Sequence, residues 1–114
     1  MMRRGEVWVA NLNPSRSSEI GKVRPVVIVQ ADELIAAPCP MLVVLLLTTR
    51  IYSGLGRFRV TLPARDRLLL DSQVVVDQPR SLDRERLGEG PLTRLSATEM
   101  AAVEQSLMGV LGLM

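Results

Sequence analysis

Residues 23–30 read VRPVVIVQ and residues 41–49 read MLVVLLLTT, and these two stretches decide the fold. Both consist mainly of Val, Ile and Leu, a composition that predicts a β-strand in each place. The second stretch has no polar residue before Thr48, so we expect a central strand that is buried on both faces. Pro25 cannot donate a hydrogen bond to a neighbouring strand, which places it near a strand start or at a sheet edge.

Three stretches outside this pair predict further strands. They are residues 5–12 (GEVWVANL), 57–62 (RFRVTL) and 72–77 (SQVVVD). The first two alternate between their faces, which is typical of strands in an antiparallel sheet. Between residues 31 and 40, two prolines predict a short turn. Residues 78–83 (QPRSLD) also predict a turn, and residues 84–95 fit no single element.

A helix is expected after Ser96. Ser96 and Glu99 have the spacing of a capping box, in which each side chain accepts from the other residue's backbone N–H. Apolar residues then follow at helical spacing and form a stripe along one side of the helix, which should pack on the sheet. The alternative is that part of this stripe packs on a second subunit. The sequence therefore predicts one domain over residues 1–114: a mainly β (α+β) fold, with a small, partly open antiparallel barrel and a C-terminal helix.

The composition excludes several kinds of site. Among 114 residues there is no histidine and one cysteine, Cys39. An intrachain disulfide and the usual zinc ligand sets are therefore excluded, and neither a metal nor a cofactor is expected. Without histidine, any chemistry has to use carboxylates, hydroxyls and arginines.

The charged residues give weaker information. Fourteen basic and twelve acidic residues leave a net charge of +2, and Lys22 is the only lysine. An arginine-rich surface suits nucleic acid, although a GC-rich genome produces the same ratio. The N-terminus does not have the pattern of a signal peptide, and the longest apolar run, Met41 to Leu47, is far shorter than the roughly 20 residues that span a bilayer. We expect a cytoplasmic protein with no membrane segment.

Several motifs together resemble the MazF/PemK family of toxin endoribonucleases. In family order and spacing they are RGEVWV (residues 4–9), LNP (12–14), SE (18–19) ahead of Lys22, VRPVVIVQ (23–30), LLTT (46–49) and VVDQPRSLD (75–83), with Arg86-Leu87 after it. The resemblance covers nearly the whole chain. It implies an SH3-like barrel, a homodimer and metal-independent cleavage of single-stranded RNA to 2′,3′-cyclic phosphate and 5′-hydroxyl ends. It also implies a MazE-like antitoxin that covers the RNA groove, and operator DNA as a ligand of the toxin–antitoxin complex.

The resemblance assigns catalytic roles to Arg24 and Thr48. A guanidinium can grip two phosphate oxygens and keep its charge through the reaction. A hydroxyl at the end of a buried strand is rigidly held, and a register error of one residue would move this role to Thr49. Glu19, in the long loop over residues 13–22, is either a general base or the residue that orients Arg24. Ser18 lies where some family members carry a histidine, so a histidine-assisted mechanism is not expected.

Asp77, Gln78 and Arg80 form the second family motif. Asp77 and Gln78 have the chemistry to read base edges, while the alternative for Asp77 is an Asx-type turn before Pro79. Arg80 is expected to contact a phosphate or a carboxylate. One family branch has a catalytic arginine two residues before this aspartate, and Val75 stands there in this chain.

Two other function classes remain open. The first is a gyrase poison on the same fold, a family that acts through a C-terminal Trp-Gly-Ile, whereas this chain ends in Gly-Leu-Met. The second is an RNA- or protein-binding module without catalysis. Trp8 is either a stacking platform for a base or, as its place between valines favours, a packing residue.

Overall fold

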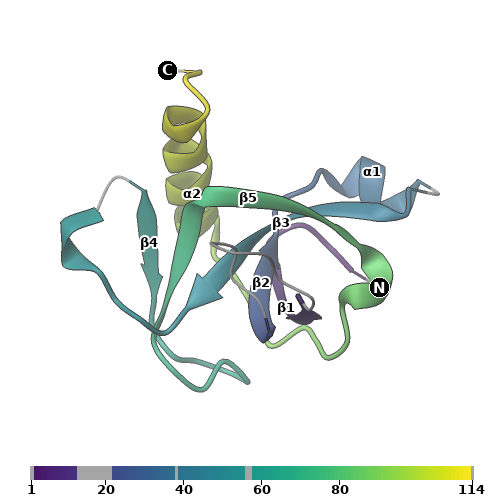
Figure 1. Cartoon of the computed structure of the whole chain (residues 1–114), viewed down its shortest axis with the longest axis horizontal. Coiled ribbons are helices and arrows are strands. Elements are labelled where there is room, and N and C mark those ends of the chain that lie inside the picture. Colours follow the sequence, from purple (N-terminus) through teal and green to yellow (C-terminus); the bar gives the residue numbers. More distant parts are fainter. Residues whose placement is uncertain (1, 13–21, 38, 56–57, 114) are drawn as a thin grey trace.

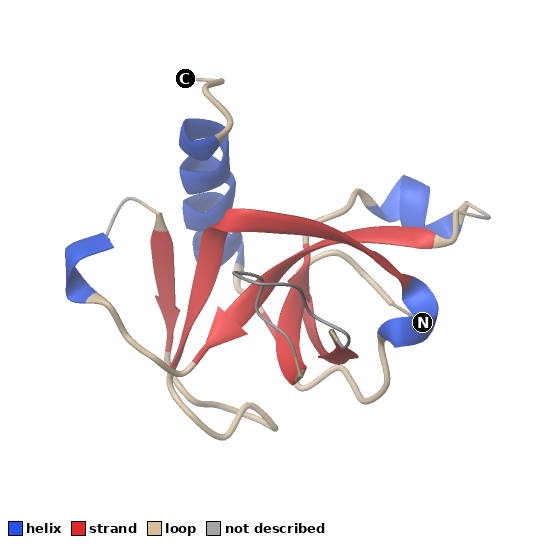
Figure 2. Cartoon of the chain, viewed as in Figure 1, coloured by secondary structure: helices blue, strands red, loops and turns tan. Residues whose placement is uncertain are grey.

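A curled antiparallel sheet with a helix on one side forms the architecture of the computed structural model, which describes residues 2–12, 22–37, 39–55 and 58–113 (Figures 1 and 2). In these residues the six strands have the spatial order β4-β5-β3-β2-β1-β6. Their bounds are β1 Glu6–Asn11, β2 Val23–Ile28, β3 Met41–Thr48, β4 Arg59–Leu62, β5 Ser72–Asp83 and β6 Thr93–Arg94. The helices are α1 Asp32–Ala36 and α2 Ala97–Val110, with short 3-10 turns at Ser53–Leu55 and Arg84–Arg86. The prediction of a mainly β, partly open barrel with a C-terminal helix is confirmed.

The two faces of the sheet carry separate apolar clusters. On one face, Val27, Leu45 and Val74 are fully buried and pack with residues of α2, including Val103. On the other face, Val26, Leu46 and Val75 form a second cluster, which the curled sheet closes with Leu12, Ile35 and Leu87. Figure 1 shows α2 rising from the sheet beside β4 and β5, so only the first face is covered by the helix.

The capping box at the start of α2 is confirmed. The Ser96 hydroxyl accepts from the Glu99 N–H at 3.1 Å, and the Glu99 carboxylate accepts from the Ser96 N–H at 2.9 Å. The buried stripe of the helix is narrower than its apolar residues suggest, because Ala101 and Ala102 are exposed. None of the described helices is long and apolar enough to span a membrane.

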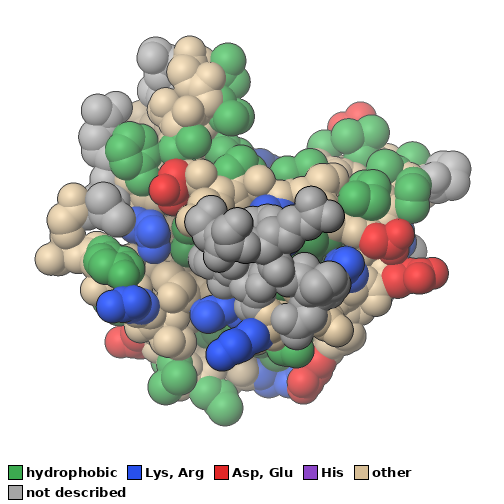
Figure 3. All heavy atoms as spheres, in the orientation of Figure 1, with side chains coloured by type: hydrophobic (Ala, Val, Ile, Leu, Met, Phe, Trp, Pro, Cys, Tyr) green, Lys and Arg blue, Asp and Glu red, His purple; other side chains and the backbone are tan. Residues whose placement is uncertain are grey.

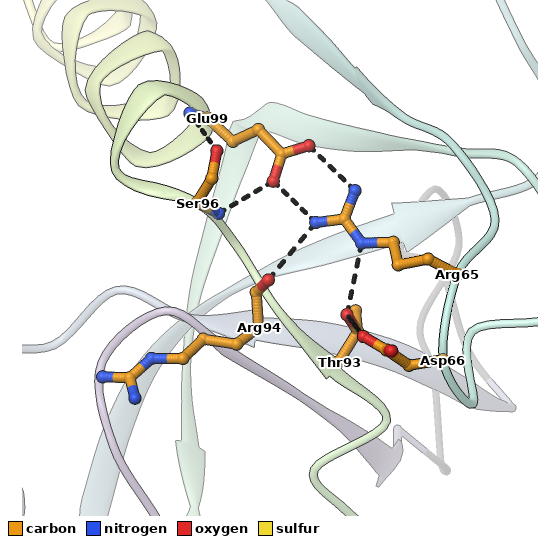
Figure 4. Close-up of polar contacts among 6 residues, drawn as sticks. All are labelled: Arg65, Asp66, Thr93, Arg94, Ser96 and Glu99. Carbon is orange, nitrogen blue, oxygen red and sulfur yellow. Dashed lines mark hydrogen bonds and ion pairs between the residues drawn. The ribbon is translucent and has the colours of Figure 1, made fainter.

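Arg65 joins the segment between β4 and β5 to the start of α2 (Figure 4). Its guanidinium donates to both oxygens of Glu99, at 2.8 and 2.6 Å, and its Nε donates to the Thr93 hydroxyl at 3.2 Å. Thr93 in turn donates to Asp66 at 2.6 Å. The hydrogen bond from Arg65 holds the pKa of Glu99 below its ordinary value, against the opposing effect of burial. Glu99 therefore serves the helix cap and this ion pair with one carboxylate.

The predicted turn over residues 78–83 is wrong, because β5 continues through it to Asp83. Pairing with β3 jumps from Val75↔Leu46 to Arg80↔Val44, so four residues of β5 bulge opposite a single residue of β3. Pro79 lies inside this bulge, where its missing N–H removes no ladder hydrogen bond. The Asx turn that was the alternative role for Asp77 belongs to this predicted turn, so it is not supported either.

Other local expectations are corrected as well. The short turn between residues 31 and 40 contains a helical turn, α1. The first half of β3 has a wet side, because Met41 and Val43 are 39% and 37% exposed. Residues 84–95 run along β1 through the 3-10 turn and β6, with Gly88 donating to Val9 O at 2.8 Å. The structure thus has one strand more than expected.

Trp8 is a packing residue. Its ring packs on the second apolar cluster, and its Nε1 donates to the buried Glu6 carboxylate at 3.1 Å. Gly90 lies so close that a Cβ there would be 2.4 Å from Trp8 Cδ2. The ring therefore packs the returning segment against β1, as its place between valines favours.

Candidate active site

Arg24 and Thr48 lie on the same face of the sheet, at the same end. Val26 of β2 is opposite Leu46 of β3, and two residues further along each strand stand Arg24 and Thr48. In a β-strand, residues two apart share a face, so both side chains project from the face of the second apolar cluster. Arg24 and Thr48 begin a row of side chains that crosses the sheet on this face. The row continues onto β5 and β4, because Thr48 is opposite Gln73 and Gln73 is opposite Thr61.

Thr48 and Thr49 have different surroundings. The Thr48 hydroxyl oxygen accepts from the Arg50 N–H at 3.2 Å, which leaves its O–H able to donate to a ligand. Thr49 lies just beyond the strand and lines a shallow hollow of about 420 Å³ with Ile51, Leu69 and Leu70. The structure thus places Thr48, and not Thr49, in the row with Arg24.

The long loop leaves and re-enters the sheet beside Arg24. Leu12 N donates to Lys22 O at 2.8 Å, which closes the base of the loop. Lys22 has a φ of 70°, a left-handed conformation that is uncommon for a residue with a side chain. Ser18 and Glu19 lie outside the described residues. The base of the loop, at Leu12 and Lys22, thus lies directly beside the strand that carries Arg24.

Basic side chains surround this end of the sheet. Lys22 and Arg24 are at the start of β2, and Arg86 donates to Asn11 O, at the end of β1, at 3.0 Å. Arg50 and Arg59 stand on the opposite side, after β3 and in β4. Figure 3 shows several lysine and arginine side chains over the lower part of the face in view, with acidic side chains around its margin, including the α1 edge. Such a surface attracts anionic ligands.

Sequence reasoning missed three connected residues: Gln73, which is opposite Thr48, Tyr52, which Gln73 binds, and Arg59, which contacts the Tyr52 ring. The side-chain amide of Gln73 accepts from Tyr52 N at 3.0 Å and donates to Tyr52 O at 3.1 Å. The guanidinium carbons of Arg50 and Arg59 each lie 5.5 Å from the Tyr52 ring centroid. The only sequence signal was that Tyr52 is the single tyrosine, since the contacts depend on a strand register that no motif encodes.

The second family motif lies in the β5 bulge and at its end, with Asp77 and Gln78 inside the bulge and Arg80 at the first pair after it. Asp77 Oδ1 is 3.8 Å from Arg59 Nε, and its side chain is half exposed, while Gln78 is half-buried. Arg80 is opposite Val44, four residues along β3 from Thr48, a separation of about 13 Å along an extended strand. The structure therefore brings Asp77 to the edge of the site and sets Arg80 apart from Arg24 and Thr48. In the described parts of the chain, no three Cys, Asp or Glu side chains converge to hold a metal ion.

Comparison with known proteins supports this architecture. A MazF structure from Deinococcus radiodurans is 28% identical, with a TM-score of 0.81 over 97% of this chain and 96% of that one. A MazE–MazF complex from the same organism is 26% identical, with a TM-score of 0.78 over 99% and 97%. An endoribonuclease in complex with its cognate antitoxin, from mycobacteria, is 22% identical and has a TM-score of 0.80 over 100% and 98%, a likeness of fold.

A family model decides the assignment. It describes a PemK-like, MazF-like toxin of type II toxin–antitoxin systems, and it matches residues 3–111. The match contains every motif on which the resemblance in sequence was based. The chain therefore belongs to the PemK-like, MazF-like toxin family of type II toxin–antitoxin systems.

Proposed function

We propose that this toxin is an endoribonuclease that cleaves single-stranded RNA without a metal ion and leaves 2′,3′-cyclic phosphate and 5′-hydroxyl ends. The observation that carries the proposal is the position of Arg24 and Thr48, on one sheet face at one end, in a family-matched chain. The basic residues around that end supply the charge that an RNA backbone needs.

The chemistry assigns different tasks to the two side chains. In the reaction, the 2′-oxygen attacks phosphorus and loses its proton, and the leaving 5′-oxygen gains one. Negative charge builds on the phosphate oxygens in between, where a fixed guanidinium and a hydroxyl donor lower the barrier. Arg24 supplies the guanidinium. Thr48 supplies the O–H, because its oxygen already accepts from the Arg50 N–H.

The remaining family residues receive supporting roles. Glu19 orients Arg24, since an ion-paired carboxylate is a poorer base, and Ser18 contributes to the same loop. Asp77 and Gln78 read base edges from the bulge of β5, and the distance of Arg80 from Thr48 suits a phosphate further along the strand. Thr49 is not assigned a role in the reaction, because it lines a different hollow.

We propose a MazE-like antitoxin as the protein partner, supported by the similarity to the Deinococcus MazE–MazF complex. An acidic segment suits the basic end of the sheet because it mimics the charge of RNA. The proposal includes a homodimer that acts on cytoplasmic RNA, and operator DNA bound by the toxin–antitoxin complex.

The test is cleavage of a long RNA of known sequence in the presence of EDTA, with the 5′ ends mapped. Wild-type protein should produce discrete cuts, Arg24→Ala should produce none, and circular dichroism should show both to be folded. Arg94→Ala is the matched control. This exposed arginine lies on β6 opposite Glu6, at the other end of β1, and its loss should leave the cuts unchanged.

Cuts that disappear with EDTA would contradict the metal-independent mechanism. An absence of cuts from a folded protein that still binds the RNA would instead favour the non-catalytic binding module. Equal cleavage by wild type and Arg24→Ala would contradict the catalytic role that we assign to Arg24.

A further inference from the structure

Tyr52 is tied to the strand position that faces Thr48. Its backbone N–H and C=O are both bonded to the side-chain amide of Gln73, which is 4% exposed. Gln73 is in turn the register partner of Thr48. Two hydrogen bonds to one buried amide fix the backbone of Tyr52 beside the strand position that faces Thr48, although Tyr52 lies outside the regular strands.

Tyr52 is 40% exposed, and the guanidinium carbons of Arg50 and Arg59 both lie 5.5 Å from its ring centroid. The two arginines are not equivalent. The Arg59 side chain is only 11% exposed, and Asp77 Oδ1 lies 3.8 Å from its Nε, which has no hydrogen-bond partner among the described residues. Arg50 is exposed, its backbone N–H donates to the Thr48 hydroxyl, and its guanidinium contacts the Tyr52 ring.

This difference determines which contact a ligand can replace. A planar group that stacks on the ring can displace the exposed guanidinium of Arg50, while the buried Arg59 stays in place. Displacement requires only side-chain rotation, because the backbone hydrogen bond of Arg50 to Thr48 is unaffected. The released guanidinium then reaches a phosphate next to the stacked group, which offsets its lost cation–π contact.

We propose that Arg50, Tyr52 and Arg59 form a subsite for one nucleotide of single-stranded RNA beside the Thr48 hydroxyl. The base stacks on Tyr52, Arg50 binds the adjacent phosphate, and Arg59 keeps its cation–π contact with the ring. The subsite rests on the proposed function for the identity of its ligand. It adds binding energy next to the reacting phosphate and takes no part in the proton transfers.

The single tyrosine allows a direct test, because the chain labelled with 3-fluorotyrosine gives one ¹⁹F resonance. The probes are single-stranded 2′-O-methyl oligonucleotides that tile the RNA of the cleavage assay and cannot be cleaved, since they lack the attacking hydroxyl. Binding is followed in parallel by fluorescence anisotropy. We expect the resonance to move with the same concentration dependence as the anisotropy, and not to move with equimolar inorganic phosphate.

Variants give an independent measurement. Tyr52→Leu should weaken oligonucleotide binding by about 5- to 150-fold, the range for loss of one stacked base. In the cleavage assay it should raise KM with little change in kcat, and Tyr52→Phe, which keeps the ring, should restore binding. Arg94→Ala is again the control that should change neither quantity.

The outcomes separate the subsite from the proposed function. Binding by anisotropy with an unmoved ¹⁹F resonance would overturn the subsite, whether or not the RNA is cut. A shift with phosphate alone would also overturn it, because an anion site would then suffice. Specific shifts without any cleavage would support the subsite and contradict the endoribonuclease. No binding at all would overturn both.

Discussion

At the scale of single residues, Thr48 and Thr49 provide a matched pair. Thr48→Val keeps the shape of the side chain but removes the hydroxyl that we assign to the phosphate oxygen. We expect kcat to fall by about 10²- to 10³-fold, the cost of losing one preorganised donor to developing negative charge. Thr49→Val removes the same group from a side chain that lines a different hollow and should cut RNA at the wild-type rate. Cleavage of a substrate with the mapped motif measures both. Equal losses in the two variants, or a loss confined to Thr49→Val, would contradict the assignment.

The family resemblance transfers roles to Arg24 and Thr48 from the sequence alone, but it left Thr49 open, and only the strand register of the structure separates the two threonines. The sequence did not indicate Tyr52, Gln73 or Arg59. Their contacts arise because β3 and β5 are in a register that sets Gln73 opposite Thr48, and β4 brings Arg59 opposite Val75. Thr48 and Gln73 are 25 residues apart in the chain, and Arg59 and Val75 are 16 apart, so no local sequence pattern predicts these neighbours.

At the scale of elements, the return of the chain along β1 depends on a close contact between Gly90 and Trp8. A Cβ at Gly90 would lie 2.4 Å from Cδ2 and 2.7 Å from Cγ of the indole, atoms that cannot move aside as a flexible chain end would. We expect Gly90→Ala to lower the free energy of unfolding by about 1–3 kcal/mol, as overpacking does.

Gly88 is the control for this substitution, because it has open space around its Cβ position. Gly88→Ala should change the free energy of unfolding by less than about 1 kcal/mol. Urea unfolding measures both variants, and fluorescence of the single tryptophan reports whether the ring has moved. A Gly90→Ala protein as stable as Gly88→Ala, with unchanged fluorescence, would show that this contact is not restrictive.

The start of α2 makes a pH-dependent contribution to stability. The pKa of Glu99 is lowered from its ordinary value of 4.5, mainly by the Arg65 hydrogen bond. A lowered folded-state pKa means that the unfolded chain takes up the proton first as the pH falls. The stabilisation is therefore complete above about pH 4.5 and is lost as the pH falls through the lowered pKa of the folded protein.

Glu99→Gln should cost about 1–2 kcal/mol at neutral pH, and its difference from wild type should shrink below pH 4.5. Glu104→Gln is the control, since the ion pair of Glu104 with Arg4 is more exposed and should contribute less than about 0.5 kcal/mol. Urea unfolding as a function of pH measures both. A Glu99→Gln deficit that stays constant into the acid range would contradict the ion pair as its source.

The elements also show why part of the fold escaped prediction. The strands with simple alternation or continuous apolar runs, β1 to β4, were expected, as was the capped helix α2. The sequence of the second half of β5 predicts a turn, because Pro79 cannot donate a ladder hydrogen bond. The bulge satisfies this restriction without ending the strand, and a bulge depends on the partner strand, which a local pattern does not contain. Likewise, β6 is two residues long, and its pairing with β1 defines it.

At the scale of the whole molecule, the net charge is only +2, but the basic side chains are unevenly distributed over the surface. Lys22, Arg24, Arg50 and Arg86 gather at the end of the sheet where β2 begins and β3 ends, and Asp77 offsets the nearby Arg59. If each of the four cations contacts one phosphate, the logarithm of the binding constant for a single strand should fall with the logarithm of salt concentration with a slope of about −3.

Single substitutions resolve this slope into its parts. Arg86→Ala should make the slope shallower by about 0.7, because one phosphate contact is lost. Tyr52→Leu should weaken binding at every salt concentration and leave the slope unchanged, since stacking releases no counterions. Arg94→Ala, at the far end of β1, should alter neither affinity nor slope. Anisotropy titrations of the 2′-O-methyl oligonucleotides over a range of salt concentrations measure all three. A slope near zero, or a slope that changes equally in Arg94→Ala, would mean that RNA is held elsewhere on the surface and would contradict this end of the sheet as the RNA site.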